Sequence, residues 1–229
     1  MAHLGELSRK AGGSRLADVI LGGQDGLVNV LGVILGVAAA SSDPKIVIAG
    51  GLAATFAESI SMAAVAFTSM TAERDHYRSE LEREKREMKE LPKKEEAEIR
   101  KVYRDKGFDG KLLEDIVAHV ISSKPLWLEQ MMKEELELKE VKQKEIYISS
   151  AVVGFSALVG SFVPLTPFFF FPISLALWYS LGLSVIVLFF VGMYKAKVTI
   201  GSPLKSAIQM AVIGMGAALA GYLIGKIFS

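Results

Sequence analysis

The sequence of 229 residues contains no cysteine and only three histidines. Without cysteine the chain forms no disulfides, thiolate metal sites or cysteine-bound iron–sulfur clusters. Any metal site must use oxygen, imidazole or thioether ligands. An excess of charge of either sign is also missing, with 26 basic and 25 acidic residues. Because no basic patch is left unbalanced by nearby acid, no nucleic-acid partner is expected.

The charged residues are concentrated in one part of the chain. Between Glu73 and Glu145 lie 20 of the 25 acidic and 18 of the 26 basic residues. Outside this block the composition is that of a membrane protein, so 51% hydrophobic residues can coexist with 22% charged residues. We therefore expect a membrane protein with a charged, helical domain inserted between two of its spans.

Five apolar stretches are long enough to cross a bilayer, which needs roughly 20 residues per helix. Breaks rich in proline, glycine and serine separate them. The predicted spans are 16–40, 46–71, 146–163, 169–194 and 204–228. The predicted fold is all-α, with five transmembrane helices and a cytoplasmic helical domain between the second and the third. The corresponding domains are 1–72, 73–145 and 146–229.

Basic residues in the short flanks predict the orientation, because they accumulate on the cytoplasmic side. With five spans, one side carries the charged block and most of the flanking basic residues, which are Arg9, Lys10, Arg15, Lys195, Lys197 and Lys205. The other side carries Lys45 and Lys226. The N-terminus and the block are therefore expected in the cytoplasm. Residues 1–15 lack the short apolar core of a signal peptide, so no cleavage is expected.

Three acidic residues fall inside predicted spans, where a carboxylate costs about 3 kcal/mol to insert. Asp18 and Asp25 are seven residues apart and share a helix face, and Glu58 lies one turn before Met62. No span offers a clear basic partner, so these acids must be protonated, hydrated or bound to a cation. A path used in turn by protons and a metal ion satisfies all three conditions. The alternatives are a helix cap at Asp18, a bend at Asp25 and ordinary packing of Met62.

Glycines four residues apart allow close helix packing. Gly32 and Gly36 form one such pair, and Gly221 and Gly225 form another. They fit packing within one protomer or a seam between two protomers.

The charged block predicts four helices, at 74–90, 94–106, 112–121 and 126–147, the last leading into the third span. Glu84 and Glu87 are three residues apart, as are Glu95 and Glu98, so each pair shares one helix face. A further group at helical spacing consists of Met131, Met132 and Glu135.

Helical bundles that bind paired divalent metals direct carboxylates inward in this way. Oxygen ligands suit iron and manganese, and a thioether adds a soft contact that magnesium and calcium do not favour. The alternative is a solvated helix face with ion pairs along it.

Several short motifs follow one another in a distinctive order. Asp-Gly-Leu-Val (25–28) lies in the first span and Ser61-Met62 in the second, before Arg-Asp-His-Tyr (74–77) in the charged helix. Glu-x-x-Glu then occurs twice and Met-Met-x-x-Glu once, followed by three more spans. Over nearly its whole length the chain resembles the vacuolar iron transporter family.

The resemblance implies a homodimer in the bilayer that moves ferrous iron, often manganese as well, out of the cytosol in exchange for protons. Cobalt and zinc are further candidate ions, and no prosthetic group is expected. By position in the motifs, the metal-gathering residues are Glu84, Glu87, Glu95, Glu98, Met131, Met132 and Glu135. The translocation path is matched by Asp25 and Met62 with Asp18 near its mouth, and Glu58 is added on physical grounds. The membrane is the plasma membrane in a prokaryote and the vacuolar membrane in a eukaryote.

Two other functions fit parts of the pattern. The first is a membrane-anchored di-metal oxidase or metal sensor without transport. No histidine stands three residues after any of the named glutamates, as catalytic di-iron bundles require, so an enzyme is not expected. The second is a proton-coupled carrier of another solute, with a regulatory block.

Overall fold

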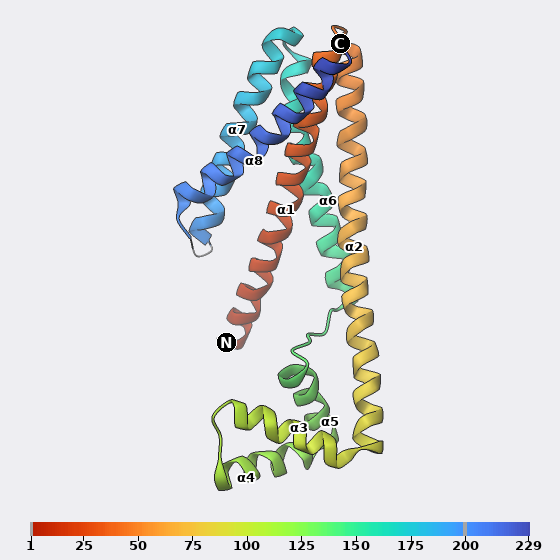
Figure 1. The fold of residues 1–229 in the computed structure, drawn as a ribbon, viewed down its shortest axis with the longest axis vertical. Coiled ribbons are helices and arrows are strands. Elements are labelled where there is room, and N and C mark those ends of the chain that lie inside the picture. The colour runs from red at the N-terminus through yellow and green to blue at the C-terminus, as the bar shows by residue number, and fades with distance from the viewer. Residues whose placement is uncertain (1, 199–200) are drawn as a thin grey trace. The chain divides into compact units, whose positions relative to one another are not determined.

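The computed structural model describes residues 2–198 and 201–229, and their side chains from residue 15 onward (Figure 1). Arg9 and Lys10, used above for orientation, are therefore outside the described side chains. Every regular element in the described ranges is a helix. The chain divides into two compact units, Met1–Phe67 with Tyr147–Ser229, and Thr68–Ile146. The second unit contains all of residues 73–145.

The first unit is built from long apolar helices. They are α1 (Ala2–Ala40), the first half of α2 (Pro44–Glu90), α6 (Gln143–Leu165), α7 (Ile173–Val198) and α8 (Pro203–Ile227), with a short 3₁₀ turn η2 (Thr166–Phe169). Among the described residues, five helices are long and apolar enough to cross a membrane, which confirms the predicted number of spans. Large apolar side chains such as Trp178 and Phe190 are exposed on this unit, as expected for a surface that lipid covers.

Glycines bring the helices of the first unit into backbone contact. A Cβ atom on Gly221 would lie 2.0 Å from the Gly32 carbonyl oxygen, and one on Gly225 would lie 2.1 Å from that of Gly36. Both glycine pairs thus lie in the contact between α1 and α8 within one protomer.

The contact of α1 with α6 is equally close and lies beside the membrane acids. A Cβ atom on Gly22 would lie 2.1 Å from the Val153 carbonyl oxygen, and one on Gly26 would lie 2.2 Å from that of Ala157. Only glycine allows this approach, which fixes the part of α1 that carries Asp25.

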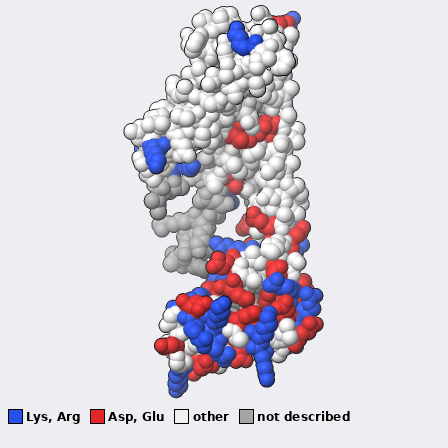
Figure 2. Space-filling view, in the orientation of Figure 1, with Lys and Arg blue, Asp and Glu red and all other residues white. Residues whose placement is uncertain are grey.

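The second unit consists of the charged end of α2 and of short helices. These are α3 (Pro92–Asp105), α4 (Gly110–Ile121), α5 (Lys124–Gln130) and a π-helix η1 (Met131–Glu135). The turn between α3 and α4 uses two glycines with positive φ, Gly107 and Gly110. A small apolar core holds the helices together and is formed by Ile99, Leu113, Val117, Val120, Trp127 and Met131. Figure 2 shows basic and acidic side chains crowded over the surface of this unit.

The predicted helix over 126–147 is wrong. The helix α5 widens into η1, where the Leu136 amide donates to the Met131 carbonyl, and a non-helical segment precedes α6. Glu137 has a φ of 54°, which ends the helical path. The residues of this segment favour helix, so local preference is overridden by tertiary structure, which buries both Met131 and Met132.

Candidate metal centre

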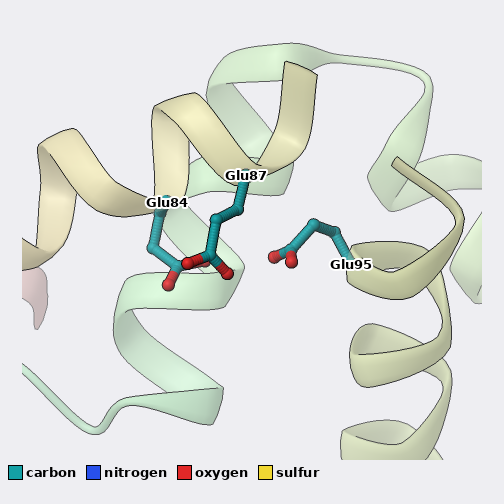
Figure 3. Close-up of side chains that lie close together, drawn as sticks. All are labelled: Glu84, Glu87 and Glu95. Carbon is teal, nitrogen blue, oxygen red and sulfur yellow. The ribbon is translucent and has the colours of Figure 1, made fainter. Parts of the chain in front are cut away.

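A sharp corner between α2 and α3 brings three glutamates together. The helix α2 ends at Glu90, Leu91 adopts a non-helical conformation, and Pro92 starts α3 at a position where its missing N–H is not needed. This corner makes Glu84 and Glu87 of α2 face Glu95 of α3 (Figure 3). One carboxylate oxygen from each of the three lies within 4.8 Å of the others.

These carboxylates are largely withdrawn from water. Glu84 is 2% exposed and Glu95 is 0% exposed. The Oε2 atoms of Glu84, Glu95 and Glu135 are buried and accept no hydrogen bond from the described residues. A buried carboxylate oxygen without a partner is costly, and either a proton or a cation at these atoms would offset that cost.

The charges of the cluster act on one another. The pKa of Glu95 is raised from 4.5 to about 7, first by burial and then by the negative charges of Glu98 and Glu84. The pKa of Glu135 is also raised to about 7, by burial and by the same two neighbours. Glu98 of α3 and Glu135 of η1 therefore belong to the same electrostatic cluster as the three clustered glutamates.

Two basic side chains partly neutralise this cluster. The Arg83 guanidinium lies 2.8 Å from Glu80 and 3.0 Å from Glu84. The Lys94 ammonium lies 3.2 Å from Glu87, 3.4 Å from Glu95 and 3.3 Å from Glu98. Hydrogen bonds to Glu87 and Glu98 raise the pKa of Lys94, so the amine is charged.

The two methionines have different surroundings. Met131 is 0% exposed and packs in the apolar core with Ile99 and Trp127, so packing alone explains its burial. Met132 is 2% exposed and lies on the turn of η1 that also carries Glu135. Of the two thioethers, that of Met132 is the better candidate for a metal contact.

An open groove of about 440 Å³ is lined by Glu98 and Glu135 of the electrostatic cluster. Its lining residues are Glu98, Lys101, Val102, Asp105, Lys106, Glu134 and Glu135. An ion pair between Lys106 and Glu134 connects the end of α3 to η1 at this groove. Ions in solution can thus approach Glu98 and Glu135 between α3 and η1.

The three acids of the predicted spans, Asp18, Asp25 and Glu58, are half-buried and have polar partners. The Ser149 hydroxyl of α6 donates a hydrogen bond of 2.7 Å to Asp18. The Asn29 amide donates one of 3.2 Å to Asp25, and the Glu58 side chain of α2 adjoins both Asn29 and Asp25.

The helix that carries Asp18 and Asp25 bears on two of the alternatives raised by the sequence. Since α1 is one helix from Ala2 to Ala40, Asp18 does not cap its start, and Asp25, which accepts from Asn29, lies within the helix. Met62 is half-buried one turn after Glu58 on α2. Two helices thus contribute Asp25 and Glu58 to one acidic pair inside the apolar unit.

Sequence reasoning missed four polar residues of these sites. Asn29 stands one turn after Asp25, and Lys94 stands one turn before Glu98, so helical spacing could have identified both. Arg83 could have been found by the same spacing, because it stands three residues after Glu80 and four before Glu87. No local signal identifies Ser149, because it meets Asp18 only through the packing of α6 against α1.

The fold and the sites define a class of protein, namely a multi-pass helical membrane protein with a buried acidic cluster in its charged unit. Residues 16–226 match the model of the VIT family. Vacuolar iron transporter 1 of Oryza sativa subsp. japonica is 32% identical over 215 residues, covering 93% of this chain and 85% of the relative. Vacuolar iron transporter 1 of Tulipa gesneriana is 31% identical over 210 residues, covering 91% and 85%. The vacuolar iron transporter of Plasmodium falciparum is 31% identical over 223 residues, covering 93% and 81%.

The chain belongs to the VIT family. The resemblance inferred from the order of the motifs is thereby confirmed.

Proposed function

We propose that the protein is a proton-coupled carrier that exports ferrous iron, and manganese as a second substrate, from the cytosol. The observation that carries the proposal is the buried cluster of Glu84, Glu87 and Glu95 with its unpartnered carboxylate oxygens. Membership of a family whose named relatives are iron transporters supports iron as the substrate.

The charged unit serves as the cytosolic metal intake. Carboxylates from α2, α3 and η1 supply the hard oxygen ligands that ferrous iron and manganese accept. The groove lined by Glu98 and Glu135 offers ions a way to reach the cluster. The thioether of Met132 would favour iron over magnesium, because soft ligands disfavour hard ions. Cobalt and zinc fit the same ligand set.

The acidic pair Asp25 and Glu58 serves as the membrane site, with Met62 as its soft ligand and Asp18 nearer the cytosol. A metal ion and protons compete for these carboxylates, since each neutralises a charge that is expensive inside a membrane. Protonation from the far side displaces the metal and resets the carrier. The site is completed by a second protomer across a two-fold axis, in the plasma or the vacuolar membrane.

The experiment is uptake of ferrous iron into proteoliposomes with an imposed pH gradient, under reducing conditions. We expect Asp25→Asn and Met62→Ala to abolish or strongly reduce uptake. Asp43→Asn is the matched control, because Asp43 lies in the loop before α2 and its replacement keeps a side-chain acceptor for the Lys45 amide. If both membrane variants transport like the wild type, this path is wrong. Oxidation of ferrous iron without flux would favour the oxidase instead.

A further inference from the structure

The position of Lys94 within the acidic cluster is unusual for a surface lysine. Its ammonium lies 3.2 Å from Glu87 Oε2, 3.4 Å from Glu95 Oε1 and 3.3 Å from Glu98 Oε1. An ammonium group has three N–H donors, and here three carboxylates surround it. Two of these carboxylates, Glu87 and Glu95, also belong to the group whose oxygens lie close enough together to hold a metal ion.

An ordinary helix ion pair accounts for only part of this arrangement. The contact with Glu98 is the usual pairing of residues four apart on one helix. The contact with Glu87 instead crosses from α3 to α2, and Glu95 is fully buried. The Lys94 side chain itself is 53% exposed, so it can turn into solvent without disturbing the core.

We infer that the Lys94 ammonium is a resident counter-ion, which occupies the acidic cluster in the metal-free protein and is displaced when a divalent cation binds. The inference rests on the proposed metal-binding role of the cluster. A carboxylate oxygen that bonds a metal no longer accepts from the ammonium, and two cations a few ångströms apart repel each other. Metal and ammonium therefore exclude each other.

This exchange tunes the affinity of the intake. While Lys94 is bound, the cluster keeps part of its charge neutralised, which lowers the cost of burying Glu87 and Glu95. A metal ion must outcompete that cation, so binding is weaker than to the carboxylates alone. As the metal dissociates, the ammonium takes its place on the same oxygens, which promotes release of the metal. Weak, reversible binding suits an intake that passes its ion onward.

The first test is a calorimetric titration, in which Mn²⁺ is added to the full-length protein in detergent. We expect Lys94→Gln to bind Mn²⁺ about tenfold more tightly than the wild type, and Lys94→Arg to stay near the wild-type affinity. Lys93→Gln is the matched control, since it removes the same charge from the adjacent exposed residue, which forms no ion pair in the described part of the chain. Lys94→Gln binding no more tightly than Lys93→Gln would overturn the inference.

The second test follows the amine directly. The wild-type protein is treated with an acetylating reagent, with and without saturating Mn²⁺, and labelling is read by mass spectrometry. We expect acetylation of Lys94 to rise severalfold with Mn²⁺ while that of Lys93 is unchanged. Unchanged labelling of Lys94 would overturn displacement while leaving the metal centre intact. A wild type that binds Mn²⁺ no better than Glu84→Gln/Glu95→Gln would overturn the proposed metal centre, and this inference with it.

Discussion

Replacing Glu95 by glutamine should stabilise the metal-free protein at alkaline pH. Burial and the charges of Glu98 and Glu84 raise the pKa of Glu95 from 4.5 to about 7. A carboxyl group whose pKa is raised on folding destabilises the fold when it ionises. This penalty is absent below the unfolded pKa and grows until the pH exceeds the folded pKa. A shift from 4.5 to about 7 corresponds to about 3 kcal/mol at full ionisation.

Because the neighbouring carboxylates adjust as Glu95 ionises, the measurable gain is expected at about 1–3 kcal/mol at pH 8. At pH 4 the variant and the wild type should be equally stable. Unfolding of the charged unit can be followed by the fluorescence of Trp127, which lies in the core of that unit. The chain has two tryptophans, so a Trp178→Phe background leaves Trp127 as the only reporter. Measurements are made in detergent with a chelator present.

Glu129→Gln serves as the control, since Glu129 is an exposed carboxylate of α5 in the same unit. It should change the free energy of unfolding by less than about 0.5 kcal/mol at either pH. The reasoning would be refuted if Glu95→Gln lowered the stability at pH 8, or if its effect were the same at pH 4 and pH 8.

Three further predictions follow from the two units. Raising the pH from 6 to 8 should increase the Mn²⁺ affinity of the wild type about tenfold or more, because Glu95 and Glu135, with a pKa of about 7, ionise. The same affinity at both pH values, measured by calorimetry, would contradict this. Gly26→Val should lower the melting temperature of the apolar unit without removing Mn²⁺ binding, since its Cβ would lie 2.2 Å from the Ala157 carbonyl oxygen. Ser149→Ala should slow iron uptake severalfold while leaving Mn²⁺ binding unchanged, because the Ser149 hydroxyl positions Asp18. Unaltered uptake would show that Ser149 has no such positioning role.

The features that depend on local composition could be predicted from the sequence. Apolar runs predicted the five helices of spanning length, and the charged residues 73–145 lie within the unit Thr68–Ile146. Glutamates three residues apart share a helix face, so Glu84 and Glu87 were correctly expected to point the same way. The helices predicted at 74–90 and 94–106 leave a break that contains Leu91 and Pro92, and this break is the corner that brings Glu95 to these two glutamates.

Features that depend on contacts between distant segments could not be predicted. Helix-favouring residues continue after Glu135, yet the chain leaves the helical path at Glu137, while η1 packs against α3. The pairing of Asp25 with Glu58 depends on how closely α1 and α2 approach, which helical periodicity does not specify. The glycine pairs were compatible with either of two interfaces, and only the packing of α1 on α8 distinguishes them.

The most direct test of the metal centre is the location of a bound ion. Crystals of the full-length protein soaked in Mn²⁺ would be measured for anomalous scattering. The account predicts an anomalous peak within bonding distance of Glu84, Glu87 and Glu95, with the Lys94 amine turned away from them. A peak elsewhere, with this cluster empty at saturating Mn²⁺, would contradict it.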